Sequence, residues 1–194
     1  MTSQSSNLLD NYNRYMYLKI LVDSNNDDLK SRYYHAVNSH NLKVANKPQH
    51  IDAGFDLFTP QEQLMTNTNV NKLDYQIICS AKMIEKKQSN DNNNNDYDYS
   101  CSNTGYYMYS RSSISRNNIR LANNVGIIDS GYRGHLIGMF DVIYIDELIV
   151  NKFDRHVQIC APGLVPIYVE LVSSLEQLGE ETERKDGGFG STGI

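Results

Sequence analysis

The chain has 194 residues, and 40% of them are hydrophobic, which is enough for one ordinary domain with its own core. Its formal net charge of −5 argues against a general nucleic-acid or anionic-membrane binder, since no excess of Lys and Arg is present to release counterions. No apolar run approaches the ~20 residues that a membrane span needs.

The three cysteines, Cys79, Cys101 and Cys160, show no metal-ligand spacing. An odd number of cysteines without a signal peptide predicts an intracellular, reducing compartment, cytoplasmic or nuclear. We therefore expect all three to be small structural residues, buried or at the surface, with no role as metal ligands.

The first part of the chain opens with polar residues 1–14, which we expect to be disordered. Residues 15–22 (YMYLKILV) predict the first strand. Residues 27–38 begin with acidic side chains and have apolar residues near helical spacing, which predicts a short helix. Residues 52–58 (DAGFDLF) alternate like a strand with one solvated face, where Asp56 is either a solvated strand-end carboxylate or a functional one.

The middle of the chain continues with one or two strands over 70–84 and an Asn-rich run that predicts a mobile surface loop over 86–104. A Tyr-rich strand follows at 106–109 and leads into 111–115 (RSSIS). There a guanidinium, hydroxyls and N–H groups at a turn can hold phosphate oxygens. Taken alone, the same residues would only form a solvated face.

Residues 123–134 (NNVGIIDSGYRG) are the centre of the sequence. One apolar run ends at Asp129, the turn-prone Ser130 and Gly131 follow, and a second apolar run starts at Leu136, which predicts a β-hairpin. A carboxylate, a phenol and a guanidinium crowd its tip, where exposed main-chain groups can pair with the edge of a base. The alternative is that Asp-Ser-Gly is an ordinary turn.

The last third begins with residues 136–145 (LIGMFDVIYI), which are apolar on both alternating faces. Such a strand must be covered on both sides, and in a β domain of this size we expect another subunit to supply the second cover. Two more strands are predicted at 157–161 and 165–171. The polar segment 173–194 ends in GGFGSTGI and is either a flexible tail or a flap that closes over phosphates.

Five short signatures in this order resemble the five motifs of the trimeric dUTP pyrophosphatases (dUTPases). They are AGFDL at 53–57, RSSIS at 111–115, NNVGIIDSGYRG at 123–134, Asp154-Arg155 with Gln158, and RKDGGFGSTG at 184–193. The resemblance implies an all-β fold, a distorted jelly roll or β-clip, over residues 15–172. The helix 27–38 and the loop 86–104 would be insertions, and the assembly would be a homotrimer with shared active sites.

The resemblance implies hydrolysis of dUTP to dUMP and pyrophosphate by in-line attack of water on the α-phosphorus. Asp129 would be the general base. Asp56 would hold a water of a bound Mg²⁺, an ion that keeps several waters. Tyr132 would pack on the deoxyribose. The uracil would be contacted by Asn123, Gly126, Ile127, Ile128 and Ile137. The phosphates would be contacted by Arg111, Ser112, Ser113 and Gln158. The tail would contact the nucleotide in a neighbouring site through Arg184, Phe189, Gly190, Ser191 and Thr192.

Four positions depart from the family's pattern. Ser110 replaces a Pro, and Ser113 replaces a Gly, which would be mildly strained if that position requires a positive φ, or would add a phosphate contact if it only requires room. Gly131 replaces a second carboxylate that many members carry, and His135 stands where Glu or Gln is common. Neither of these last two changes is expected to abolish activity.

Two other functions stay open. A dCTP deaminase-like relative would need a water-activating Glu near the base-reading hairpin, where this chain has His135. A catalytically weak, nucleotide-binding regulatory protein of the same fold would follow if the changes at Ser113 and Gly131 disable turnover. The intact Asp129 and Tyr132 favour the enzyme. The Asn-rich run is typical of AT-rich genomes, such as those of large viruses or protists.

Overall fold

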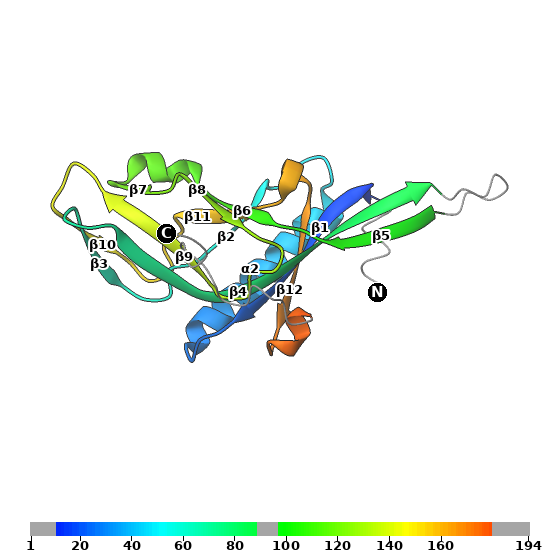
Figure 1. Cartoon of the computed structure of the whole chain (residues 1–194), viewed down its shortest axis with the longest axis horizontal. Helices are drawn as coiled ribbons and strands as arrows, with labels where there is room; N and C mark the ends of the chain where they lie inside the picture. The colour runs from blue at the N-terminus through cyan, green and yellow to red at the C-terminus, as the bar shows by residue number, and fades with distance from the viewer. Residues whose placement is uncertain (1–10, 89–96, 180–194) are drawn as a thin grey trace.

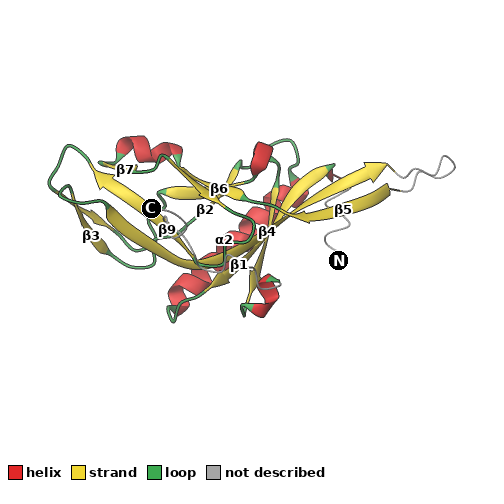
Figure 2. Cartoon of the chain, viewed as in Figure 1, coloured by secondary structure: helices red, strands yellow, loops and turns green. Residues whose placement is uncertain are grey.

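The computed structural model describes residues 11–88 and 97–179, and within them the chain is mostly β with one α-helix. Figure 1 shows the order of the elements, and Figure 2 shows that strands make up most of them. The predicted β class is confirmed. No helix in these ranges is long and apolar enough to cross a membrane.

The largest sheet in the described chain has the strand order β12-β1-β4-β9-β7, with β5 paired to β4 as well. Its strands are β1 (Arg14–Val22), β4 (Asn71–Gln88), β5 (Tyr97–Asn103), β7 (Ile119–Leu121), β9 (His135–Val142) and β12 (Ile167–Val172). β1 and β12 are parallel, and the other pairs are antiparallel. The stretch 70–84 is therefore part of one long strand, which has a register shift between Asp74 and Ile78.

A second sheet has the order β2-β11-β6-β8, and a two-stranded ribbon joins β3 to β10. The strands are β2 (Gly54–Asp56), β6 (Tyr106–Ser110), β8 (Val125–Ile128), β11 (Val157–Cys160), β3 (Gln63–Thr66) and β10 (Glu147–Val150). Short 3₁₀ helices cover Ser112–Arg116, Pro162–Leu164 and Glu176–Leu178. Residues from all three groups of strands contribute to one main core, which includes Leu18, Phe55, Met65, Met108 and Phe140.

The helix α2 (Asp27–Asn46) is eight residues longer than the predicted 27–38. Its N-cap residue is Asn26, whose side chain accepts a hydrogen bond from the N–H of Leu29. The extension was missed because polar residues carry several of its contacts, beside the buried Val44. His40 bonds to the carbonyl of Ile167, and Asn41 bonds to both the N–H and the C=O of Val169. These bonds cover the outer edge of β12, which would otherwise offer unpaired backbone groups.

The predicted loop over 86–104 is wrong for most of its length. β4 continues to Gln88, β5 resumes at Tyr97, and the two pair in register from Lys82↔Asn103 to Gln88↔Tyr97. The ribbon that they form extends away from the rest of the molecule in Figure 1. The low-complexity composition predicted a loop. The pairing of β4 with β5 needs only backbone hydrogen bonds, however, so it tolerates polar side chains. Most of the Asn-rich run, 89–96, lies outside the described residues, as do most of 1–14 and of the tail from 180 onward.

The strand predicted over 136–145 is β9, and it ends at Val142. Its inward face is buried at Leu136, Phe140 and Val142, while its other face is half-buried within this single chain. Tyr144, beyond the strand, is 90% exposed. The strands predicted at 157–161 and 165–171 are confirmed as β11 and β12, to within two residues at each end. Cys79 and Cys160 are buried, Cys101 is exposed, and all three are free thiols.

Candidate functional site

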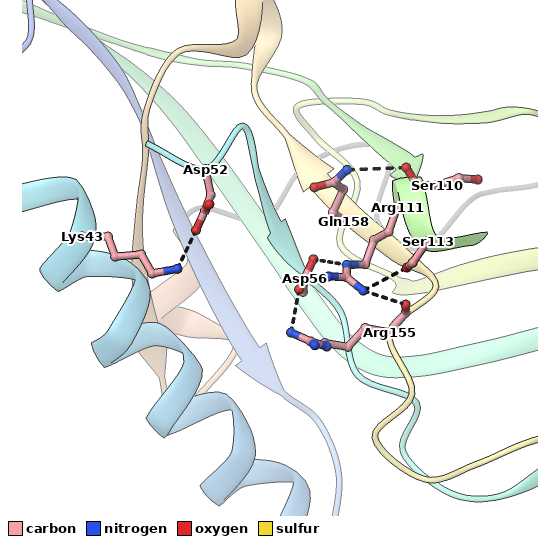
Figure 3. A network of polar contacts seen from close by, with 8 residues as sticks. All are labelled: Lys43, Asp52, Asp56, Ser110, Arg111, Ser113, Arg155 and Gln158. Atoms are coloured by element: carbon pink, nitrogen blue, oxygen red, sulfur yellow. Dashed lines mark hydrogen bonds and ion pairs between the residues drawn. The ribbon is translucent and has the colours of Figure 1, made fainter. Parts of the chain in front are cut away.

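Three strands of the second sheet end at a cluster of charged side chains. The carboxylate of Asp56, at the end of β2, lies 2.7 Å from Nε of Arg111 and 3.0 Å from Nη1 of Arg155 (Figure 3). Nη1 of Arg111 also donates to the hydroxyl of Ser113 at 3.2 Å and to the carbonyl of Arg155 at 3.3 Å. Gln158 lies beside them and donates to the carbonyl of Ser110 at 3.4 Å.

Strand register explains why these residues meet. β11 lies between β2 and β6, so that Gln158 is opposite both Asp56 and Tyr109. Side chains in such a row point to the same face of a sheet. Arg111 follows β6 directly, and its N–H bonds to the carbonyl of His156. The cluster therefore combines residues of three sequence motifs that lie up to about a hundred positions apart.

The cluster is locally basic in an acidic chain, because two guanidinium groups share one carboxylate. Arg111 and Arg155 keep 26% and 48% of their side-chain surface exposed. Each guanidinium has five N–H donors, so both retain donors for a ligand. A cavity of about 440 Å³ opens beside them and is lined also by Asn117, Asn151 and His156. This geometry suits an anion with several oxygen atoms, such as a phosphate group.

Ser113 resolves one question that the sequence left open. It lies in the 3₁₀ helix Ser112–Arg116 and is not among the residues with a positive φ. The Gly-to-Ser departure therefore carries no backbone strain, and the Ser113 hydroxyl adds a polar group beside Arg111. Ser112, the neighbouring predicted contact, is exposed, and its carbonyl accepts a hydrogen bond from Ser115.

The turn that carries Asp129 exists, but the predicted hairpin pairing is wrong. The N–H of Tyr132 bonds to the carbonyl of Asp129 at 3.0 Å, which closes a four-residue turn. In the described chain β8 pairs with β6 and β9 pairs with β4 and β7, and no ladder joins β8 to β9. Asn124 has a φ of 60° and redirects the chain from the first sheet to the second between β7 and β8. Asn tolerates a positive φ, so Asn124 can form this turn, although the sequence pattern indicated only the start of a strand there.

The other predicted uracil contacts lie around this opened turn. Gly126 is buried in β8, where an added Cβ would lie 3.2 Å from the Met108 side chain. Ile127 is 74% exposed, Ile128 and Ile137 are half-buried, and Asn123 is exposed. The predicted contacts Arg184, Phe189, Gly190, Ser191 and Thr192 lie outside the described residues.

Tyr132 and Arg133 shape the turn from inside. The Tyr132 hydroxyl donates to the carbonyl of His135, and its ring lies over Gly134, where a Cβ would come within 2.7 Å of the ring carbon Cζ. Nη1 of Arg133 donates to the carbonyls of Ser130 and Tyr132, at 3.1 and 2.8 Å. Only glycine at 134 leaves room for this arrangement of the phenol.

The turn and the charged cluster are at opposite ends of one sheet. In the antiparallel pair, Ile128 is opposite Tyr106 and Val125 is opposite Tyr109, so Asp129 lies beyond the end of β6 that is far from Arg111. A Cβ on Gly105 would lie 3.8 Å from Cα of Asp129, which confirms this placement. With ~3.3 Å per strand residue, Asp129 and Arg111 are on the order of 15 Å apart or more. Within one chain, the residues around Asp129 and the charged cluster around Arg111 therefore lie apart.

Two features escaped the sequence analysis. Arg155 had no predicted role, although it belongs to the motif formed by Asp154-Arg155 and Gln158. Its side chain contacts Asp56 directly. His135 lies between two carboxylates, with Nδ1 2.9 Å from Asp74 and Nε2 3.1 Å from Asp23. No local pattern could reveal that second cluster, because its members come from three strands or strand ends.

His135 gives a pH-dependent contribution to stability. Partial burial would lower its pKa, but the hydrogen bonds and charges of Asp74 and Asp23 outweigh that effect and raise the pKa. A raised pKa in the folded state stabilises the fold at pH below the unfolded value of ~6.5, and this contribution is lost as pH rises through the folded value. His135→Gln should therefore lower the melting temperature more at about pH 6 than at about pH 8.5. A deficit that stays constant over this range, measured by calorimetry, would contradict the assignment.

The strands and the charged cluster together are typical of a β protein with a site for phosphate groups. A model of the dUTPase family matches residues 75–193, more than half of the chain. The chain belongs to the dUTPase family.

Curated relatives are named deoxyuridine 5′-triphosphate nucleotidohydrolase. The one from Desulfitobacterium hafniense is 35% identical over 91 residues, which cover 46% of this chain and 58% of that protein. The one from Alkaliphilus metalliredigens is 27% identical over 144 residues, 74% of this chain and 84% of that protein. Among solved structures, a dUTPase of Staphylococcus bacteriophage 80alpha covers 91% of this chain and 98% of its own, with a TM-score of 0.45 and 17% identity.

Proposed function

We propose that the protein hydrolyses dUTP to dUMP and pyrophosphate, with the charged cluster binding the phosphates. The observation that carries this proposal is the meeting of Asp56, Arg111, Ser113 and Gln158, four predicted site residues from three motifs, at the end of one sheet. Membership in the dUTPase family and the names of the relatives support the same substrate.

The uracil ring would bind at the opened turn. β8 and β9 each keep an edge that no described strand covers near the turn, so main-chain N–H and C=O groups are available to a base edge. Gly126 of β8 and Ile137 of β9, which lie on the two sides of the turn, would exclude a 5-methyl group. Tyr132, held over Gly134, would pack against the deoxyribose and exclude a 2′-hydroxyl.

Asp129 would orient and deprotonate the attacking water. The main-chain bond from the Tyr132 N–H to the Asp129 carbonyl keeps the two residues in one turn, so the carboxylate would act near the sugar. The guanidinium groups would neutralise the charge that builds up on the phosphates, so one carboxylate suffices as the base.

The site would be shared between subunits of a homotrimer. Asp129 and Arg111 lie at opposite ends of the β6–β8 pair, whereas a single nucleotide must touch both the base and the phosphate residues. A second chain that presents its Arg111 cluster to the Asp129 turn would complete the site. The half-buried outer face of β9 supports such contacts. The tail residues Arg184 and Phe189 would close the site of a neighbour.

Mg²⁺ would be held through water by Asp56. Both carboxylate oxygens accept from guanidinium groups, so neither is free for direct ligation without a rearrangement. Each oxygen still has a lone pair for a metal-bound water, which fits an ion that keeps most of its waters. Among the described residues no three His, Cys, Asp or Glu side chains are grouped to ligate a metal directly. When bound, the ion would neutralise phosphate charge and orient the triphosphate.

Substrate selectivity tests the proposal. With Mg²⁺ present, the purified protein should release pyrophosphate from dUTP, and the rates with dTTP, dCTP and UTP should be at least about 100-fold lower, because steric exclusion acts on a tightly packed site. Pyrophosphate release can be followed with a coupled phosphate assay. Equal rates with UTP would remove Tyr132 from its role, and release of ammonia from dCTP would place the protein with the deaminases.

A further inference from the structure

The loop that carries Arg155 contains a strained residue. Phe153 has a φ of 70°, in the left-handed region that residues other than Gly, Asn and Asp rarely adopt. Its N–H bonds to the carbonyl of Thr59, and the N–H and hydroxyl of Thr59 bond to the carbonyl of Asp154 at 2.9 and 3.0 Å. The Asp154 side chain in turn accepts from the N–H of Asn151. The backbone around Phe153 is thus fixed on one side by the segment after β2.

The helix α2 holds the same loop from the other side. Cζ of Arg32 lies 4.8 Å from the centroid of the Phe153 ring and 5.7 Å from that of Phe58. Lys152 also lies 4.8 Å from the Phe153 centroid, and its ammonium group bonds to Asp28 at 2.7 Å. Asp28 and Arg32 are four residues apart, so they face the loop from one side of the helix.

We propose that Arg32 is a positioning residue for the phosphate-binding cluster, because it keeps Phe153 in its left-handed conformation and thereby fixes Arg155. Arg32 approaches the ring from α2, whereas Lys152 is adjacent to Phe153 in the loop itself and would move with it. Without Arg32 over its ring, Phe153 would relax toward a negative φ. That rotation would move the peptide before Asp154 and displace Arg155, whose side chain contacts Asp56 and whose carbonyl accepts from Arg111. The inference rests on the proposed function, since it assigns α2 a role in substrate binding.

Variants of Arg32 separate its charge from its packing. Arg32→Met keeps an apolar stem but removes the cation, and it should lower kcat/KM for dUTP by about three- to fivefold, as expected for loss of one partly exposed cation–π contact. Arg32→Lys keeps a cation and should stay within about twofold of wild type. Lys43→Met is the matched control, because Lys43 is on the same helix but bonds to Asp52, away from the loop.

The decisive measurement is a double-mutant cycle with Phe153→Gly, which removes both the ring and the strain. In that background Arg32→Met should have no further effect on kcat/KM. An equal loss in both backgrounds, or unchanged kinetics of Arg32→Met in the native background, would overturn the proposal. If Phe153→Gly does not fold, Phe153→Asn serves as the background, since Asn also tolerates a positive φ.

A second readout separates this inference from the proposed function. The affinity of the same variants for inorganic tripolyphosphate, measured by calorimetry, should follow the same order as kcat/KM. A wild-type protein that is inactive on dUTP would contradict the proposed function, while the tripolyphosphate affinities would still decide the role of Arg32. Equal affinities of wild type and Arg32→Met would overturn that role.

Discussion

Replacement of Asp129 by Asn is expected to lower kcat for dUTP by at least about 100-fold, while the affinity for a non-hydrolysable dUTP analogue stays within about twofold. The amide has nearly the same shape and keeps the turn, since the bond that closes it is between the main chains of Asp129 and Tyr132. The side-chain amide of Asn cannot accept a proton from water. Single-turnover kinetics and calorimetry of the analogue measure the two quantities separately.

Asp98→Asn is the matched control, because Asp98 is an exposed carboxylate on β5. Its kinetics should equal those of wild type. A fully active Asp129→Asn protein would show that another group is the base. A variant that loses affinity and turnover together would show that Asp129 mainly binds the nucleotide.

Replacement of Arg111 by Ala is expected to lower kcat/KM by about 100-fold, since a guanidinium that contacts phosphate oxygens contributes through charge and through two directed bonds. The change also leaves Arg155 as the ion-pair partner of Asp56, so the less neutralised carboxylate would repel the substrate. Arg111→Lys should recover only part of the loss, because an ammonium group cannot replace the fork that contacts both Asp56 and Ser113.

Arg14→Ala provides the comparison for Arg111, because Arg14 forms an ion pair with Glu85 on the large sheet, far along the chain from the cluster. It should leave steady-state kinetics unchanged. Adding Asp56→Asn to Arg111→Ala should restore some affinity for tripolyphosphate if repulsion by the carboxylate contributes to the loss. A cluster that binds no phosphate would show no such recovery and no effect of Arg111→Ala.

Alternation of apolar and polar residues predicted the short strands well. β12 alternates between buried and half-buried residues over its first four residues, and β11 does so over its first three. The same reasoning failed where contacts are made by polar groups. Asn41 and His40 extend α2 by bonding to β12, and polar residues of β5 extend the large sheet by backbone pairing alone. Such contacts depend on a partner that is remote in sequence.

The residues that meet in the charged cluster were named from the sequence, but their arrangement could not be predicted from it. Asp56, Arg111 and Gln158 were each identified from motifs, whereas their meeting depends on β11 lying between β2 and β6. The separation of Asp129 from Arg111 likewise depends on the antiparallel register of β6 and β8. An apparent hairpin in the sequence gave no sign that its two strands belong to different sheets.

Subunit mixing tests most directly whether one catalytic site needs two chains. Asp129→Asn and Arg111→Ala proteins, each inactive alone, should regain about a quarter of the wild-type activity when they are unfolded and refolded together. In a randomly mixed symmetric oligomer, about one site in four combines an intact Asp129 from one chain with an intact Arg111 from another. Different affinity tags on the two variants would confirm that mixed oligomers form. Mixed oligomers without any dUTP hydrolysis would show that Asp129 and Arg111 do not serve one shared site.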